Sequence, residues 1–429
     1  MPARWFPALR LFPGLRSVAW LLIWAGVGSL WPAAGRAQEA RPLQFENPKK
    51  RRAILPFEFQ RNLIIVQASL NGQGPFNFLL DTGVGTSLIT DPSLAGLLKL
   101  RRGETYRVAG VGEEGPLEAF HTDSVRLTMP GIVGPALSFL VLSADVLNLS
   151  GYVGMPVHGI LGYDVFHSFA VRIDPQAAAL ELHAPHTYRP PRGRRWALVP
   201  LSIESRKPYI QVPVSLTDSL VLPLKLVVDT GAGHALSIET GSDARLQLPP
   251  SRIRAQLGQG LSGTINGYLG RVRSMQLGRY RLNSLLTSFP DADNGAQRAE
   301  VPRNGNVGLE LLKRFDMVVD YPRNRLWLKP NGLYHDPFEH DMCGLELLAT
   351  GYNYRRYIVL KIEPNSPAAS AGLTPGDELV SINLLPVSSF SLTDISRIFH
   401  SEDGRVLLLL FQRPDGELYP ARIRLKRQI

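Results

Sequence analysis

Two aspartates in nearly identical surroundings are the residues of this sequence best suited to chemistry. Asp81 lies in the run Leu-Leu-Asp-Thr-Gly-Val-Gly, and Asp229 lies 148 residues later in the run Val-Val-Asp-Thr-Gly-Ala-Gly. Two carboxyl groups that face each other closely cannot both ionise, so one stays protonated while the other stays charged. We expect such a pair to take a proton from a water molecule and to give one to a carbonyl oxygen, without a covalent intermediate.

The residues that follow each aspartate suit this chemistry. Gly83 and Gly231 have no side chain, so neighbouring groups can approach the carboxyl groups closely. Thr82 and Thr230 can each turn a hydroxyl across an interface between two lobes, which would fix the positions of the carboxyl groups. The two apolar residues before each aspartate predict a buried strand that holds the acid rigid and partly desolvated.

The two aspartate runs belong to an internal repeat. Residues 110–112 (Gly-Val-Gly) are matched by residues 258–260 (Gly-Gln-Gly), and the Gly-rich segment 159–162 is matched by 305–308, 146 residues later. The alternative to a functional site is a surface turn, because Asp and Gly favour turns. Turns alone do not explain two preceding apolar runs and two sets of later glycine segments, so the repeat favours two homologous lobes.

The fold expected from these patterns is mainly β. Apolar, β-branched runs separated by turn residues predict one β lobe at residues 53–185 and a second at residues 196–333, joined by the Pro- and Arg-rich stretch 186–195. The composition changes from about residue 341. Residues 341–429 predict a third, α+β unit with an amphipathic helix at residues 392–400.

The first 37 residues have the features of a secretory signal peptide. Three arginines precede an uncharged apolar run at residues 18–30, and small residues follow at Gly35 and Ala37. We therefore expect an exported protein that is periplasmic, attached to the cell surface or secreted after cleavage near Ala37. The alternative is an uncleaved membrane anchor, for which the apolar run is short.

Composition excludes several classes of function. The chain has 429 residues and a formal net charge of +10, which falls to +6 when residues 1–37 are removed with their four arginines and no acids. No dense basic tract indicates a nucleic-acid partner. Cys343 is the only cysteine, and the nine histidines form no His-Glu-x-x-His motif. We therefore expect no intramolecular disulfide, no metal and no organic cofactor.

Both repeat copies resemble the retropepsin fold, and especially the bacterial aspartyl proteases of clan AA that carry it. The matching segments are FLLDTGVGTSLI with GILGYDVF, and LVVDTGAGHALSI with GNVGLELL. Retropepsins dimerise to bring two Asp-Thr-Gly loops together, whereas pepsin-like enzymes achieve this in one chain. The resemblance implies that Asp81 and Asp229 are catalytic, and it implies flaps that close over the substrate. The flap candidates are Gly110, Val111, Gly112, Gly258 and Gly260, for which plain tight turns are the alternative.

The second copy departs from the family pattern at two places. Asn306 breaks the apolar-apolar-Gly motif that Ile160 satisfies in the first copy, and His234 stands where the first copy has Thr86. His234 is either a specificity or pH-responsive residue or, as is more usual, a residue that satisfies a local hydrogen bond. These departures concern the fine geometry of the second lobe rather than its carboxyl group.

The third unit resembles a PDZ domain. The run Ser-Pro-Ala-Ala-Ser-Ala-Gly-Leu at residues 366–373 and the Gly-Asp pair at residues 376–377 carry the resemblance. It implies that Gly344, Leu345, Glu346 and Leu347 receive the carboxylate of a peptide through backbone N–H groups, with the peptide added as an extra strand. The alternative is a small domain that packs on the lobes without a ligand.

The function expected from the sequence is that of an aspartic endopeptidase acting on a protein or peptide substrate. A C-terminal peptide would be the ligand of the PDZ-like unit, which would position substrate or partner. One rival is a catalytically weak protein that binds peptides with the same lobes and groove. Another keeps catalysis but pairs lobes between two chains, so that each aspartate meets its own copy.

Overall fold

Apolar and β-branched runs form the strands of both repeat copies, as their composition predicts. The computed structural model describes residues 42–108, 117–260, 263–291 and 300–429. In the first copy, β4 (Leu63–Leu70) and β5 (Gln73–Leu80) form a hairpin over Asn71 and Gly72, both of which have positive φ. A turn of this kind matches the twist of the flanking strands. The second copy repeats the hairpin with β15 (Lys207–Ser215) and β16 (Val221–Val228).

Each lobe is built on one strongly bent sheet. Within the described residues, the first lobe has the strand order β1-β9-β6-β10-β5-β4-β8-β7, with β3 on β4 and a further pairing of β9 with β8. The strands not yet bounded are β1 (Gln44–Phe45), β3 (Glu58–Gln60), β6 (Leu88–Ile89), β7 (Thr105–Val108), β8 (Leu117–Met129), β9 (Ile132–Leu142) and β10 (Gly159–Leu161). The short helices of this lobe are α1 (Ser93–Leu97), α2 (Leu149–Val153) and α3 (Tyr163–Ser168). Because β1 pairs with β9, the sheet begins upstream of residue 53.

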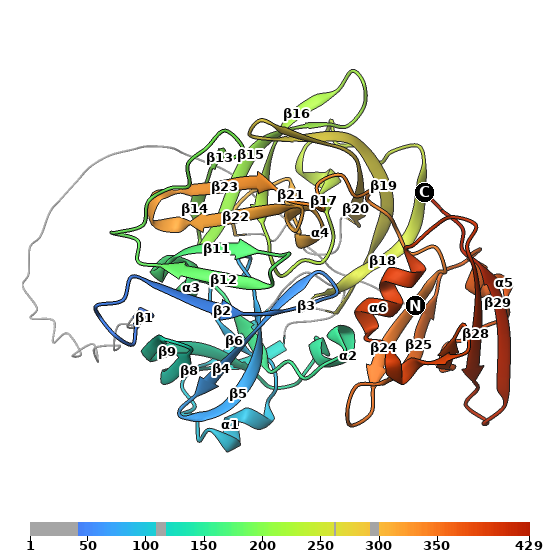
Figure 1. Cartoon of the computed structure of the whole chain (residues 1–429), viewed down its shortest axis with the longest axis horizontal. Helices are drawn as coiled ribbons and strands as arrows, with labels where there is room; N and C mark the ends of the chain where they lie inside the picture. The colour runs from blue at the N-terminus through green and yellow to red at the C-terminus, as the bar shows by residue number, and fades with distance from the viewer. Residues whose placement is uncertain (1–41, 109–116, 261–262, 292–299) are drawn as a thin grey trace, which may run out of the picture. The chain divides into compact units, whose positions relative to one another are not determined.

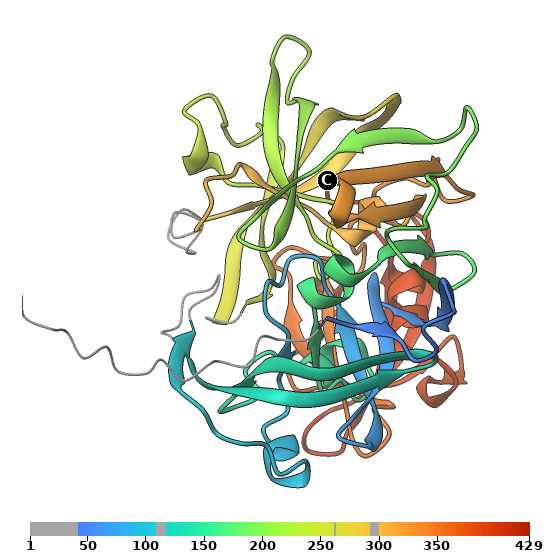
Figure 2. The same cartoon turned by 90° about the vertical axis from the view of Figure 1, so that its left-hand side faces the viewer.

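The second lobe has a sheet of the same kind. Its order within the described residues is β14-β15-β16-β21-β17-β20-β19-β18, with a further pairing of β15 with β19. The remaining elements are β14 (Ser202–Glu204), β17 (Leu236–Ile238), β18 (Arg252–Gly260), β19 (Gly263–Leu277), β20 (Tyr280–Pro290), β21 (Gly305–Val307) and α4 (Leu309–Leu312). Figure 2 shows the teal strands of the first lobe and the yellow-green strands of the second in separate sheets.

A third sheet joins the lobes, because strands from both contribute to it. Its order is β13-β23-β22-β11-β12-β2, with bounds β2 (Arg52–Pro56), β11 (Ala170–Asp174), β12 (Ala179–His183), β13 (Ala197–Pro200), β22 (Phe315–Asp320) and β23 (Arg325–Pro330). At its centre β11 and β22 run antiparallel, side by side in Figure 1, with Arg172 opposite Val318. These two residues are 146 apart, which is the offset of the repeat in this region. The two copies therefore face each other across an approximate twofold axis.

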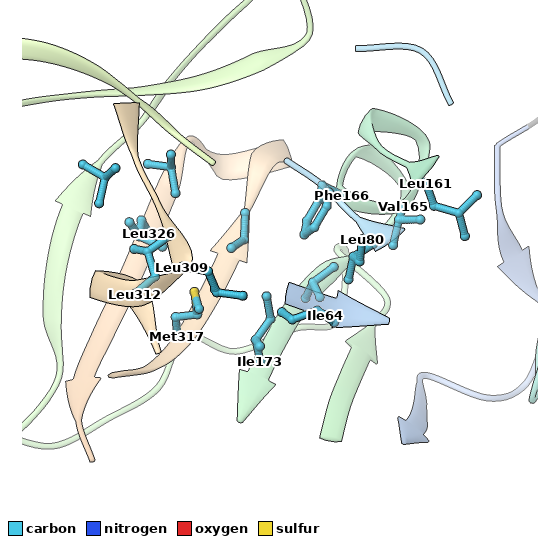
Figure 3. Close-up of a cluster of buried hydrophobic side chains, with 14 of the residues drawn as sticks. Ile64, Leu80, Leu161, Val165, Phe166, Ile173, Leu309, Leu312, Met317 and Leu326 are labelled. Atoms are coloured by element: carbon cyan, nitrogen blue, oxygen red, sulfur yellow. The ribbon is translucent and has the colours of Figure 1, made fainter. Parts of the chain in front are cut away.

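One hydrophobic core runs through both lobes. Ile64, Leu80 and Leu161 of the first lobe belong to the same buried cluster as Leu309 and Met317 of the second, and Figure 3 shows these side chains. Each fully buried aliphatic side chain stabilises the fold by about 1.5–3 kcal/mol. Because this cluster is shared, the two lobes are expected to fold and unfold together.

The third unit has its own core. Its strands are β24 (Leu345–Thr350), β25 (Arg356–Ile362), β26 (Glu378–Ile382), β27 (Leu385–Pro386), β28 (Val406–Gln412) and β29 (Leu418–Arg424), with helices α5 (Pro367–Ser370) and α6 (Leu392–Phe399). Helix α6 begins with a capping box in which Ser391 and Asp394 each accept the backbone N–H of the other. The predicted fold class, two homologous β lobes followed by an α+β unit, is confirmed.

The expected signal peptide, residues 1–37, lies outside the described residues. In the part of the chain that the structure describes, no helix has the length and apolar character needed to span a membrane.

Candidate active site

The two aspartates follow equivalent strands of the two lobes. Asp81 follows β5, which pairs in parallel with β10, and the Asp81 N–H donates to the carbonyl of Leu161 at 2.9 Å. Asp229 follows β16, which pairs in parallel with β21, and its N–H donates to the carbonyl of Val307 at the same distance. Each aspartate therefore stands at the end of a buried strand whose last backbone group is fixed by a neighbouring strand.

The two Asp-Thr-Gly loops are locked together by their threonines. The hydroxyl of Thr82 accepts the N–H of Thr230 at 3.0 Å, and the hydroxyl of Thr230 accepts the N–H of Thr82 at 3.0 Å. Each hydroxyl also donates across the interface, from Thr82 to the Val228 carbonyl at 2.6 Å and from Thr230 to the Leu80 carbonyl at 2.8 Å. Both threonines are fully buried. The lobes thus meet within one chain, through four reciprocal hydrogen bonds.

This lock brings the two carboxyl groups together. A β-carbon placed on Gly83 would lie 3.0 Å from Oδ1 of Asp81 and 3.0 Å from Oδ1 of Asp229, so the two oxygens are at most twice that distance apart. A β-carbon on Gly231 would overlap the Asp81 carboxyl group. Glycine is therefore required in both loops by close approach of the two acids. The Gly83 N–H donates to Asp81 at 2.6 Å, and the Gly231 N–H donates to Asp229 at 3.0 Å.

Burial makes Asp81 an unusual acid. Its side chain is buried, and this desolvation, followed by the negative charge of Asp229, raises the pKa of Asp81 well above its usual range. The hydrogen bond with Asp229 acts in the same direction, whereas the N–H of Gly83 acts against it. Tyr321 lies beneath the loop and donates its hydroxyl to the Thr82 carbonyl at 3.3 Å. The pair is therefore arranged to share one proton.

The departures noted in the second copy meet at Asp229. The side-chain amide of Asn306 donates from Nδ2 to Oδ2 of Asp229 at 2.8 Å, and its Oδ1 lies 3.2 Å from Nε2 of His234. His234 thus makes a local hydrogen bond, which was one of the two expectations for it. Sequence reasoning missed the contact of Asn306 with Asp229. The signal for it was the break in the apolar motif, because a polar side chain on a buried strand needs a partner.

The flap candidates fall in two places. Gly110, Val111 and Gly112 lie outside the described residues, between β7 and β8. Gly258 and Gly260 lie on β18, and Gly260 pairs with Gly263 at the end of the β18–β19 hairpin. Gly258 has a φ of +150° at an irregularity in the ladder, where glycine is favoured.

The PDZ candidates are partly engaged by the protein itself. The Gly344 N–H donates to the Asp341 carboxylate at 2.5 Å, so this N–H is not free for a peptide carboxylate. Leu345, Glu346 and Leu347 line a pocket of about 210 Å³, together with residues of α6 and with residues 256–258 of β18. The sequence indicated the strand but not its neighbour in the second lobe.

The first lobe also spans the groove between β24 and α6. Helix α2 packs on β24, and Arg61 Nη1 lies 3.5 Å from the Leu347 carbonyl. At α6, the Thr393 hydroxyl accepts the Arg61 N–H at 3.0 Å and donates to Gln60 at 2.6 Å. A peptide that extends along β24 would therefore compete with the turn between β3 and β4.

Among the described residues, no three or more His, Cys, Asp or Glu side chains form a group able to hold a metal ion. The expectation that the chain needs neither metal nor cofactor stays a prediction.

The reciprocal threonine bonds predict a large loss of stability for Thr82→Val. This change leaves the Thr230 N–H and the Val228 carbonyl buried without a partner, which should lower the free energy of unfolding by roughly 2 kcal/mol or more. Urea denaturation measures the loss. Thr122→Val is the matched control, because the Thr122 hydroxyl is buried and has no hydrogen-bond partner within the described residues. Equal losses in the two variants would contradict the lock.

The raised pKa of Asp81 predicts that Asp81→Asn becomes more stable, relative to the unchanged protein, as pH rises above the ordinary aspartate value of 3.8. Between the ordinary aspartate pKa and the raised pKa of Asp81, the folded state holds a proton that the unfolded state releases. The free energy of unfolding of the unchanged protein therefore falls in this pH range by up to about 1.4 kcal/mol per pH unit. The amide does not titrate. Unfolding free energies at pH 4 to 7 test this, with exposed Asp123→Asn as control. A difference that does not change with pH would count against the prediction.

Comparison with protein-family models agrees with this architecture. Residues 66–165 and 212–311 each match the sequence model of the aspartyl protease family, and residues 358–413 match that of the PDZ domain. A search of curated proteins finds no match. Solved structures that resemble the chain include an aspartic proteinase from Irpex lacteus, with 13% identity and a TM-score of 0.42, over 67% of this chain and 100% of that chain. The chain therefore carries two retropepsin-like aspartyl protease domains followed by a PDZ domain.

Proposed function

We propose that this protein is an aspartic endopeptidase in which Asp81 and Asp229 form the catalytic pair. The observation that carries the proposal is the close approach of the two carboxyl groups, each on an Asp-Thr-Gly loop and each with an oxygen 3.0 Å from the β-carbon position of Gly83. A pair that shares one proton holds a base and an acid at the same time. Both are needed to hydrolyse a peptide bond through water.

The reaction would run in two stages. The charged acid takes a proton from a water molecule held between the carboxyl groups, while the neutral acid donates its proton to the substrate carbonyl oxygen. The roles then reverse, so that the departing amine receives a proton. Fixing Thr82 and Thr230 in their reciprocal bonds keeps both carboxyl groups in place during these transfers. No cofactor or metal is required for any step.

The proposal extends to the substrate and the PDZ domain. The substrate is a protein or peptide, and the β18–β19 hairpin that carries Gly258 and Gly260 is proposed as a flap. The PDZ domain positions substrate or a partner by holding a chain end at β24. We further propose export after cleavage near Ala37, on the argument from the signal-like segment alone.

Two alternative functions predict different properties. A binding protein would keep the lobes and groove and hydrolyse little. A dimer that pairs lobes between chains would not need Thr82 to bond with Thr230 of the same chain. The bonds between these residues, and the pairing of β11 with β22, favour a pair formed within one chain.

Replacing either acid should abolish cleavage. An amide can neither act as the charged base nor share the proton, so Asp81→Asn and Asp229→Asn should each reduce turnover of a peptide library by at least about a thousandfold, with the fold intact. The double variant should be little worse than either single one, because the two acids act as a unit. Mass spectrometry of the digests over a range of pH measures this.

The exposed Asp123→Asn should retain activity and serves as the control. Near-normal turnover by Asp229→Asn would reduce the second lobe to a scaffold. No cleavage by the unchanged protein at any pH would favour the binding protein.

The coverage of the PDZ groove predicts that Arg61→Ala tightens peptide binding. Removing this side chain frees the Leu347 carbonyl, so C-terminal peptides should bind the full chain several-fold more tightly. Fluorescence anisotropy with labelled peptides measures the affinity, and the exposed Arg101→Ala is the control. If neither the unchanged protein nor Arg61→Ala binds any C-terminal peptide, the PDZ domain serves only to pack on the lobes.

A further inference from the structure

The two aspartates have matching loops but different neighbours beyond them. One glycine N–H donates to each carboxyl group. Asp229 also receives the side-chain N–H of Asn306 at 2.8 Å. In the first lobe the corresponding residue is Ile160, which pairs with Leu79 on β5 just as Asn306 pairs with Val227 on β16. Ile160 is buried in an apolar cluster, and its side chain has no polar atom that could donate a hydrogen bond. The two copies therefore have the same backbone around their aspartates, but only the second copy has a side chain that stabilises a charged carboxyl group.

His234 fixes the direction of the Asn306 amide. The NH₂ group of Asn306 faces Oδ2 of Asp229, and its Oδ1 faces Nε2 of His234. Oδ1 can then accept only if His234 carries a proton on Nε2. Burial lowers the pKa of His234, which favours the neutral ring, and a neutral ring with its proton on Nε2 meets this requirement. Hydrogen bonds thus run from His234 to Asn306 and from Asn306 to Asp229.

We propose that Asn306, oriented by His234, is a positioning residue that keeps the negative charge of the acid pair on Asp229 and leaves the shared proton on Asp81. The proposal rests on the proposed peptidase function. An N–H donor stabilises the charged form of a carboxyl group more than its neutral form. One hydrogen bond to a charged group is enough to favour one arrangement of the proton by about tenfold or more. Burial of Asp81 acts in the same direction.

The other charged and titratable groups near the pair do not reverse this assignment. Lys207 favours a charged Asp81, but its influence is smaller than that of burial. Tyr321 donates its hydroxyl to a backbone carbonyl and stays neutral, because burial and both aspartates raise its pKa. Asn306 is therefore the donor that distinguishes the two acids.

With the charge on Asp229 and the proton on Asp81, each proton transfer has a defined donor and acceptor. Asp229 takes a proton from water as the water oxygen bonds to the substrate carbonyl carbon, and Asp81 gives its proton to the carbonyl oxygen. The carbon–nitrogen bond then breaks as Asp229 passes its proton to the amine and Asp81 recovers one from a hydroxyl. Asn306 touches no reacting atom and acts through Asp229 alone.

The test is the pH dependence of kcat/KM for Asn306→Leu, a change of similar volume that removes the donor. Without this hydrogen bond the charged pair is less stable, so the acidic limb should move up by about one to two pH units. At a pH below the acidic limb, kcat/KM of Asn306→Leu should be about ten- to a hundredfold lower than that of the unchanged protein, and KM should change little. Ile160→Val at the corresponding place in the first lobe is the control and should not move the limb. An unmoved limb in folded Asn306→Leu would overturn the proposal.

If Asn306→Leu does not fold, two variants of His234 test the proposal instead. His234→Phe leaves Asn306 without its orienting donor, whereas His234→Gln keeps one, so the limb should move further in His234→Phe. Equal shifts would contradict the orienting role.

A readout without catalysis separates this inference from the proposed function. If the charge resides on Asp229, then Asp81→Asn keeps the charged partner of Asn306, and Asp229→Asn removes it. Asp229→Asn should therefore unfold at a lower urea concentration than Asp81→Asn at pH 7, and this gap should shrink in the Asn306→Leu background. Equal midpoints would overturn the charge assignment even if the protein cleaves peptides. Absence of cleavage with the expected gap would overturn the peptidase proposal alone.

Discussion

The reciprocal hydrogen bonds of Thr82 and Thr230 are the constraint on which the rest of the site depends. A buried backbone N–H must find a partner, and in each loop that partner is a hydroxyl from the other lobe. Neither loop can satisfy its own backbone, so the loops are complete only when the lobes meet. The shared sheet and the shared core bring the lobes together, and the threonines fix the position of one loop against the other. The proximity of the two carboxyl groups follows from this arrangement.

A symmetric scaffold holds two acids that are not equivalent. Asp81 is the more buried of the two, whereas Asp229 is half-buried and receives the amide of Asn306. Two identical carboxyl groups would leave the proton without a preferred site. A duplicated fold can break this degeneracy without changing the Asp-Thr-Gly loops, because a residue on the neighbouring strand is free to differ between the copies. His234 and Asn306 occupy such positions.

The PDZ domain contacts the first lobe through Arg61 and the second lobe through strands β18 and β19. Arg271 of β19 donates to the carbonyl of Ile429 at 3.2 Å, and Lys361 of β25 donates to Gln256 of β18 at 3.3 Å. Strand β18 therefore belongs to the second-lobe hairpin and also borders the pocket beside β24. A ligand in that pocket would touch the same strand that the proposed flap uses.

The sequence by itself determined the elements whose signals are local. The apolar runs predicted the strands that precede Asp81 and Asp229, and the repeat predicted two lobes, because strand formation and duplication leave their pattern along the chain. The tertiary structure alone decided which groups meet. It set Asn306 against Asp229, gave the Gly344 N–H to Asp341, and laid Arg61 across the PDZ groove. Such contacts join residues far apart in the chain, or depend on how a loop turns. Their energies arise only when packing brings the partners within hydrogen-bonding distance.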